Sequence, residues 1–254
     1  MNARIPTGTE GLDKLVEGGF PQGSLIVLAG SPGSGKTIAS AQYIYQGAAK
    51  EGENGVYICF GERKEIFFEN MSRIGLNFKE LEEKGKFKFL DLMTTTSAAI
   101  SDTLEIALDE VRRMKAKRLV LDSFTALATA FSNKIDARII LHLIEKLMRD
   151  IGCTTLLLVE IPMGQTGLGL GFEEFVSDGI ILFETIEVRS GIQKRSIIRK
   201  MRGTNHNQNY CKIVITDQGL SLTPYVALPT EARKIEQKKQ LERSIHPTYV
   251  HRNE

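Results

Sequence analysis

Residues 30–37, GSPGSGKT, decide the fold and the chemistry of this chain. They match the pattern G-x-x-x-x-G-K-[ST], whose glycines let successive backbone N–H groups converge on phosphate oxygens. The apolar run SLIVLA before them predicts a buried strand, and TIASAQYIYQGAAK after them predicts a helix. This strand–loop–helix context predicts a nucleotide site that involves the whole loop: Gly30, Ser31, Pro32, Gly33, Ser34, Gly35, Lys36 and Thr37.

Two side chains of this phosphate loop and one distant aspartate predict a site for ATP and Mg²⁺. Lys36 can reach the β- and γ-phosphates, and the Thr37 hydroxyl can ligate Mg²⁺. Asp122 ends the apolar run RLVLD, and a carboxylate at the carboxyl end of a parallel strand faces the crevice that holds the nucleotide. We therefore expect Asp122 to bind the metal, through a water molecule. The alternative role for Asp122 is to cap the helix that SFTALATA predicts.

Apolar strands alternate with amphipathic helices along most of the chain, which predicts an α/β fold. We expect a mostly parallel twisted sheet with helices on both faces. Strands are predicted at residues 56–60, FKFLDLM, RLVLDS and TTLLLVEI, and the strand at 56–60 is expected next to the phosphate-loop strand. After Gly179, apolar runs separated by short polar turns predict an antiparallel C-terminal extension.

The spacing of apolar residues predicts two helices, one of them with its apolar face. The first spans about residues 97–115, and the second is marked by an apolar residue on every fourth position. The predicted face of the first helix comprises Ile100, Leu104, Ala107, Leu108 and Val111, and the second helix is marked by Ile139, Leu143 and Leu147.

Length and composition indicate one globular domain. The chain has 254 residues, 42% of them hydrophobic and 25% charged, which is ordinary for a soluble protein. We expect a single domain over residues 1–228 and a charged helix or flexible tail over 229–254. The net charge of +2 is too small to predict nucleic-acid binding by itself.

The cysteines and the absence of targeting signals predict a cytoplasmic protein. Cys59, Cys153 and Cys211 are far apart and odd in number, which favours reduced thiols. The N-terminal segment lacks the apolar core of a signal peptide. No apolar run approaches the roughly 18 residues needed to cross a bilayer, so we expect no membrane association.

Residues 133–136, NKID, imitate a guanine-reading motif. The motif N-K-x-D should follow a buried strand, whereas this copy opens a predicted helix, and no D-x-x-G segment accompanies it. Asp136 is better interpreted as a first-turn or capping residue of that helix. The sequence therefore favours ATP over GTP.

With these features in place, the chain resembles the RecA-like P-loop ATPases, and within them the single-domain KaiC-like proteins of the RecA/RadA superfamily. Three segments carry the resemblance in order: RIPTGTEGLDKLVEGGFPQGSLIVLAGSPGSGKT, EFVSDGIILFE and KMRGTNHNQNYCKIVITDQGLSL. The resemblance implies ATP bound between neighbouring subunits of a homo-oligomer, either a ring or a filament.

The third segment contains the family's K-x-R-G-[ST] element. Lys200 and Arg202 match positions that reach the γ-phosphate of a neighbouring subunit, a device that stabilises charge in the transition state. As alternate residues of one predicted strand they would point to the same face. A polar strand face before a glycine turn is the alternative. His206 matches a family histidine of less certain role.

The resemblance also points to a catalytic base. The family's second strand usually ends in two adjacent glutamates that position or deprotonate the attacking water. Here the corresponding positions are Gly61 and Glu62, so Glu62 alone is the candidate base and slow hydrolysis is expected. Glu174 and Phe175 occupy the place of KaiC's phosphorylated serine and threonine, so its autokinase activity is not expected here.

Three functional hypotheses follow. The first is a Mg²⁺-dependent ATPase that assembles with copies of itself. The second is an accessory protein like the RadA paralogues, which would bind single-stranded DNA in recombination or repair. The glycine-rich loop at residues 162–171 has no lysine, arginine or aromatic residue, which weakens this hypothesis. The third is a nucleotide sensor that does not hydrolyse ATP, suggested by Gly61.

Overall fold

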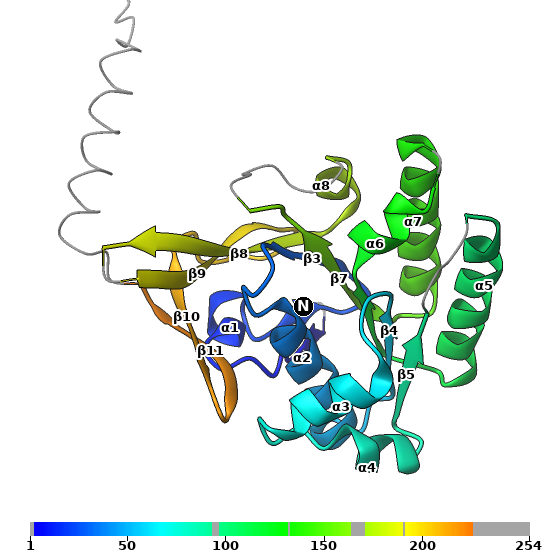
Figure 1. The fold of residues 1–254 in the computed structure, drawn as a ribbon, viewed down its shortest axis with the longest axis horizontal. Coiled ribbons are helices and arrows are strands. Elements are labelled where there is room, and N and C mark those ends of the chain that lie inside the picture. The colour runs from blue at the N-terminus through cyan, green and yellow to red at the C-terminus, as the bar shows by residue number, and fades with distance from the viewer. Residues whose placement is uncertain (1–2, 93–96, 132, 164–170, 190, 226–254) are drawn as a thin grey trace, which may run out of the picture.

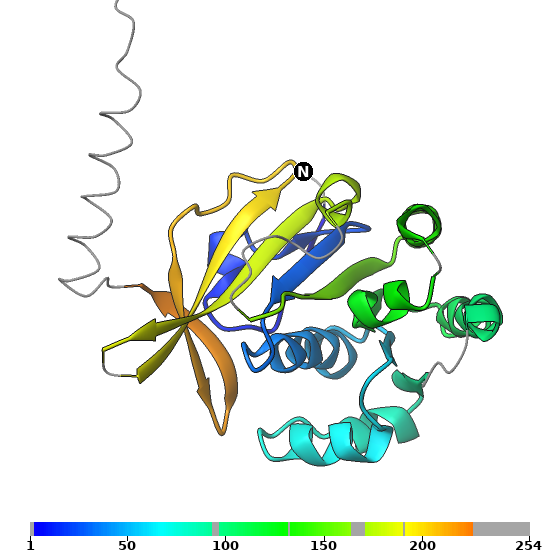
Figure 2. The same ribbon diagram turned by 45° about the horizontal axis from the view of Figure 1, so that its top comes forward.

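The computed structural model describes residues 3–92, 97–131, 133–163, 171–189 and 191–225. Within them a nine-stranded sheet lies between two layers of helices, as Figures 1 and 2 show. The strand order across the sheet is β11-β10-β9-β8-β3-β7-β6-β4-β5. The predicted tail at 229–254 lies outside the described residues, as does most of the glycine-rich loop at 162–171.

The strands of the large sheet are β3 (Leu25–Gly30), β4 (Gly55–Cys59), β5 (Phe87–Asp91), β6 (Arg118–Asp122), β7 (Thr154–Glu160), β8 (Gly179–Val188), β9 (Gly191–Met201), β10 (Cys211–Thr216) and β11 (Gly219–Pro224). β1 (Arg4–Ile5) and β2 (Phe20–Pro21) form a separate antiparallel pair. The helices are α1 (Leu12–Leu15), α2 (Lys36–Lys50), α3 (Lys64–Ser72), α4 (Phe78–Glu83), α5 (Ser97–Arg113), α6 (Phe124–Thr129), α7 (Lys134–Asp150) and α8 (Glu173–Val176). None of the helices in the described ranges is both long enough and apolar enough to span a membrane.

The sheet divides into a parallel part and an antiparallel part. β3, β4, β5, β6, β7 and β8 run parallel to one another, and β3 pairs with β7 on one side and β8 on the other. β9, β10 and β11 continue the sheet from β8 in antiparallel pairing. The predicted α/β fold with an antiparallel C-terminal extension is confirmed.

The parallel strands read as continuous apolar runs because both of their faces are covered. Alternate residues of β3 belong to two separate cores: Leu28 packs in the core beneath α2, α3 and α4, and Val27 packs in the core with α5, α6 and α7. All six residues of β3 are buried. The phosphate loop therefore starts from a fully buried strand.

The position predicted for the strand at residues 56–60 is wrong. This strand, β4, pairs with β5 and β6, and two strands, β7 and β6, separate it from β3. Since neighbouring strands lie about 4.8 Å apart, the end of β4 is roughly 14 Å across the sheet from that of β3. The sequence shows that a strand is buried but does not show which strand lies beside it.

The two predicted helices are present as α5 and α7. On α5, Leu104, Ala107, Leu108 and Val111 are buried as predicted, while the side chain of Ile100 lies outside the description. The helix that Ile139, Leu143 and Leu147 mark is α7, and Ile139 and Leu143 are 51% and 50% exposed on it. The buried residues of α7 are Ala137, Leu141, Ile144 and Met148. α7 carries two apolar stripes, and packing on the sheet selects the one with the smaller alanine.

The helix that starts at NKID begins as the sequence predicts. Asn133 is the N-cap of α7, and its Oδ1 accepts a hydrogen bond from the backbone N–H of Asp136 at 2.9 Å. Asp136 lies in the first turn, where a carboxylate is favourable. This pair serves to begin a helix.

Candidate functional site

The parallel strands define two edges of the sheet. We call the edge where they end, at Gly30, Asp122 and Glu160, the carboxyl edge, and the opposite one the amino edge. In open α/β sheets ligands bind outside the carboxyl ends of the strands. The phosphate loop lies at this edge, between β3 and α2.

The glycines of the phosphate loop are required by its backbone. Gly33 and Gly35 have φ angles of 74° and 106°, in the left-handed region that other residues avoid. At Gly35 a Cβ atom would also lie 2.7 Å from Cδ1 of Leu220 in β11. Leu220, near the start of β11, therefore packs directly on the loop.

The side chain of Lys36 folds back onto the backbone of the phosphate loop. Its Nζ donates hydrogen bonds to the carbonyl oxygens of Gly30 and Ser31, at 2.8 and 3.0 Å. Burial lowers the pKa of its ammonium group, whereas the charges of Glu160 and Asp122 raise it. The ammonium group thus lies among oxygen acceptors where phosphate oxygens could replace the carbonyls.

Asp122 meets the loop as the sequence predicts. Its Oδ2 accepts hydrogen bonds from the Thr37 hydroxyl at 3.2 Å and from the Tyr57 hydroxyl at 2.7 Å. Burial raises the pKa of the Asp122 carboxyl, and these two bonds lower it. The alternative role as a helix cap is wrong, because Ser123 caps α6 by accepting from the N–H of Ala126. The peptide bond between Asp122 and Ser123 is cis.

The pair of Thr37 and Asp122 fits a magnesium ion. Mg²⁺ prefers oxygen ligands and keeps several water molecules, so it needs only one or two protein ligands beside the phosphates. A hydroxyl and a carboxylate oxygen 3.2 Å apart at the start of α2 supply that donor set. Among the described residues, no group of three or more histidine, cysteine, aspartate or glutamate side chains forms a metal cage.

Glu62 follows β4 in the turn before α3 and is half-buried. Its Oε1 accepts a hydrogen bond from the side-chain amide of Asn70 at 3.0 Å. Burial raises the pKa of the Glu62 carboxyl, the bond from Asn70 lowers it, and the charge of Asp122 raises it further. A carboxyl whose pKa is raised toward neutrality is better suited to accept a proton.

Glu160 is a carboxylate that the sequence analysis missed. It ends β7, which lies directly between β3 and β6, and its Oε1 accepts a hydrogen bond from the Ser123 hydroxyl at 3.1 Å. Its charge raises the pKa values of both Lys36 and Asp122. The signal was available, since TTLLLVE ends in a carboxylate just as RLVLD does.

Lys200 and Arg202 lie at the amino edge, far from the phosphate loop of their own chain. Lys200 pairs with Ile180 near the start of β8, whereas Phe183, further along β8, pairs with Gly30. The Nζ of Lys200 donates to the carbonyl oxygens of Glu174 and Ser177, at 2.8 and 2.6 Å.

Arg202 contacts the same segment. It pairs with Asp178 at 3.5 Å and donates to the carbonyl of Phe175. Both cations thus contact the segment before β8, with Arg202 just beyond the end of β9, and neither reaches its own nucleotide site. A ring nitrogen of His206 lies 3.3 Å from the backbone carbonyl oxygen of Thr204.

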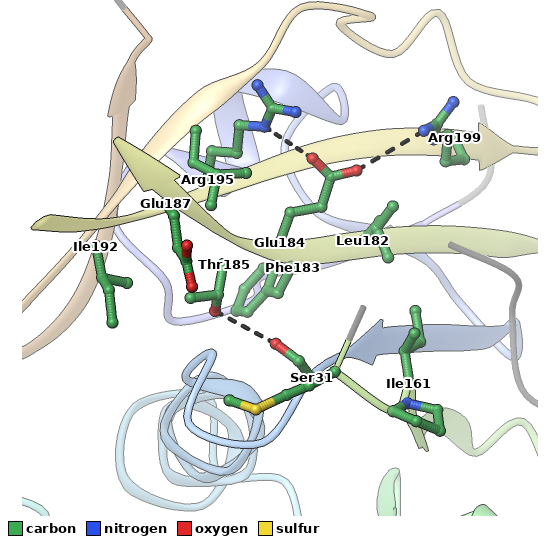
Figure 3. A pocket seen from close by; sticks show the side chains of 13 residues that line it. Ser31, Ile161, Leu182, Phe183, Glu184, Thr185, Glu187, Ile192, Arg195 and Arg199 are labelled. Atoms are coloured by element: carbon green, nitrogen blue, oxygen red, sulfur yellow. Dashed lines mark hydrogen bonds and ion pairs between the residues drawn. The ribbon is translucent and has the colours of Figure 1, made fainter. Parts of the chain in front are cut away.

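A cavity of about 460 Å³ opens beside the phosphate loop (Figure 3). Ser31 and Thr185 of β8 form one wall, where their hydroxyls are 3.3 Å apart. On another side the carboxylate of Glu184 lies between Arg195 and Arg199, at 2.7 and 3.9 Å. Lys36, Thr37 and Asp122 do not line this cavity, so it is a neighbour of the candidate site.

A family model described as the KaiC ATPase matches residues 5–226. The chain belongs to the KaiC ATPase family. Its relatives include UPF0273 proteins of Pyrococcus horikoshii, 32% identical over 88% of this chain and 95% of that protein, and of Thermotoga maritima, 31% identical over 88% and 97%. The circadian clock protein KaiC2 of Synechocystis is 28% identical over 89% of this chain, which spans 41% of that longer protein.

The fold agrees with this membership. A solved structure of a KaiC-like protein from Pyrococcus horikoshii matches with a TM-score of 0.80 and 32% identity, covering 88% of this chain and all of that chain. The resemblance to KaiC-like, RecA-type ATPases that the sequence predicts is confirmed. As a KaiC family member, this chain is a nucleotide-binding ATPase domain of the RecA-like type.

Proposed function

We propose that this KaiC family member hydrolyses ATP to ADP and phosphate with Mg²⁺, and that it does so in an assembly of identical subunits. The observation that carries the proposal is the arrangement at the carboxyl edge. Lys36 is held on the carbonyls of the phosphate loop, and the Thr37–Asp122 pair lies beside it. These groups match the charge and the oxygen chemistry of a nucleoside triphosphate with its metal ion.

The residues of the chain divide the work as follows. Lys36 exchanges the carbonyls of Gly30 and Ser31 for oxygens of the β- and γ-phosphates. Thr37 and Asp122 hold the metal ion, which neutralises charge on the phosphate oxygens when it is bound. Glu62 accepts a proton from the water that attacks the γ-phosphorus, as the bond to the β–γ bridging oxygen breaks. Its raised pKa supports this role.

Lys200 and Arg202 complete the site of an adjacent subunit. Their place at the amino edge supports action in trans, because the sheet separates them from the phosphate loop of their own chain. Arg202 has 56% of its side chain exposed and is available to a neighbour. We infer a ring or filament in which one subunit's amino-edge cations face the next subunit's carboxyl edge.

Substitution of Glu62 tests the proposal. Glu62→Gln keeps the shape of the side chain but cannot accept a proton, so we expect phosphate release to fall about 100-fold while ATP still binds. Lys36→Ala, the binding control, should lose both. Unchanged phosphate release in the Glu62→Gln variant would remove the base assignment.

The size of the wild-type particle should be measured with and without ATP in the same samples. Assembly with ATP but without phosphate release would identify a nucleotide sensor instead of an ATPase. A labelled single-stranded oligonucleotide, titrated at several salt concentrations, tests the DNA-binding alternative, since phosphate contacts make affinity fall with salt.

A further inference from the structure

Tyr57 lies behind the metal-binding carboxylate and has no role in the mechanism above. Its hydroxyl donates to Oδ2 of Asp122 at 2.7 Å, the shorter of the two bonds to that oxygen. We propose that Tyr57 is a positioning residue that orients Asp122 and thereby sets the affinity of the site for Mg²⁺ with ATP. This inference rests on the proposed function and adds a residue to it.

The position of the Tyr57 hydroxyl is fixed by packing. Tyr57 lies in the middle of β4 with no exposed surface. Its ring stacks on that of Phe89 at 5.4 Å with an angle of 11°, and the ring of Phe67 lies 4.7 Å away. A tyrosine held on two sides has little rotational freedom, so its hydroxyl presents one direction to the strand beside it.

The same hydroxyl connects Asp122 to the start of α2. The oxygen of Tyr57 is 2.9 Å from that of Ser40, whose single hydroxyl proton can go either to Tyr57 or to the carbonyl of Thr37, 3.0 Å away. A tyrosine hydroxyl ordinarily keeps its proton at neutral pH. Tyr57 is thus a permanent donor that ties β4, β6 and α2 together at the carboxylate.

The bonds to Asp122 are unevenly distributed between its two oxygens. Thr37 and Tyr57 both donate to Oδ2, and no described residue donates to Oδ1. Oδ1 is therefore open to a water molecule of the metal. Thr37 is itself a metal ligand in the proposed site, so Tyr57 is the donor that holds the carboxylate independently of the metal.

Loss of this donor should weaken metal binding rather than the chemical step. Outer-shell partners that orient a metal ligand typically contribute 10- to 100-fold to metal affinity. Tyr57→Phe removes one oxygen atom and keeps the stacked ring. We expect the Mg²⁺ concentration for half-maximal binding of a fluorescent ATP analogue to rise about 10-fold. Its affinity in EDTA should stay the same, and excess Mg²⁺ should restore turnover.

Tyr43→Phe is a matched control. Tyr43 is also a buried tyrosine, and its hydroxyl donates to the carbonyl of Thr154 at 2.8 Å, away from the metal site. The substitution removes the same atom from the same kind of environment. It should lower thermal stability without changing the Mg²⁺ requirement.

Two outcomes would overturn the inference. One is an unchanged Mg²⁺ requirement in folded Tyr57→Phe, and the other is an equal rise in Tyr43→Phe. If wild type itself shows no Mg²⁺-dependent nucleotide binding, the proposed function fails instead. If Tyr57→Phe does not fold, Ser40→Ala serves, since it removes the hydroxyl that contacts Tyr57 and leaves the rings in place. It should raise the requirement roughly two- to threefold, and no rise would contradict the proposal.

Discussion

Charged side chains at the two edges of the sheet differ in the partners that they bond to. At the amino edge, Arg118 is fully buried, and it bonds to Glu53 and to the carbonyls of Pro6 and Tyr43. At the carboxyl edge, the carboxylates of Asp122 and Glu160 accept bonds only from hydroxyls among the described side chains. The amino edge holds the fold together, and the carboxyl edge keeps charge available for a ligand.

Lys200 and Arg202 are the exception at the amino edge. Their contacts are backbone carbonyls and one carboxylate, Asp178, that Arg149 also engages. These contacts can be exchanged for phosphate oxygens without leaving a buried charge unpaired. We therefore expect Lys200 and Arg202, unlike Arg118, to act in catalysis.

Removal of Lys200 and Arg202 should have the largest effect on phosphate release. Combined Lys200→Ala and Arg202→Ala should lower phosphate release about 1,000-fold, because cations at the transferred phosphate contribute that much in related sites. ATP binding by the loop should persist. Phosphate release and binding of a fluorescent ATP analogue are the measurements.

Mixing variants distinguishes action in trans from a structural effect. Lys36→Ala protein has intact amino-edge cations, and the double variant at Lys200 and Arg202 has an intact loop. A mixture should recover part of the activity that neither variant shows alone. Activity that never rises on mixing would contradict the shared site.

The second effect tests the structural role of the amino edge. Arg118→Ala leaves Glu53 without its partner beside a cavity, so the free energy of unfolding should fall by about 3–5 kcal/mol. Arg112→Ala, at an exposed pair with Asp109, should change it by less than about 1 kcal/mol. Urea denaturation compares the two, and equal losses would show that burial at Arg118 is unimportant.

The smallest expected effect is a shift in the pH dependence of turnover, which tests Glu62 at the carboxyl edge. Glu62 must be ionised to accept a proton, and burial raises its pKa, so turnover should fall as the pH drops through that raised value. The fall should come at a higher pH than the ordinary glutamate pKa of about 4.3. Asn70→Ala removes a bond that lowers this pKa and should move the fall to higher pH still. A profile of kcat/KM that is identical in Asn70→Ala would exclude Glu62 as the titrating group.

The sequence predicts those parts of the site that depend on local order. Residues 30–37 carry their own turn, and the strand before them and the helix after them are visible as apolar patterns. Asp122 and its contact with Thr37 follow from the rule that parallel strands end at one edge. The element pattern likewise predicts the α/β fold.

The sequence does not predict the features of the site that depend on which strands are neighbours. The sequence shows that Glu160 ends a strand, but its place between β3 and β6 comes from the strand order, as does the distance of β4 from β3. Tyr57 looks like an ordinary apolar strand residue until its hydroxyl meets Asp122. α7 shows the same limit, because Ile139 and Leu143 mark the helix in the sequence, whereas tertiary packing buries Leu141 and Ile144.

The contact of β11 with the phosphate loop affects the order of events during synthesis. Gly35 packs on Leu220, and the side chain of Gln42 bonds the backbone of Leu220, which lies 178 residues further along the chain. At roughly 5–20 residues per second, a ribosome needs about 10–40 s to make that stretch. For that time the nascent loop lacks the strand that packs on it. A newly made subunit therefore completes its nucleotide site only after its C-terminal strands have left the ribosome.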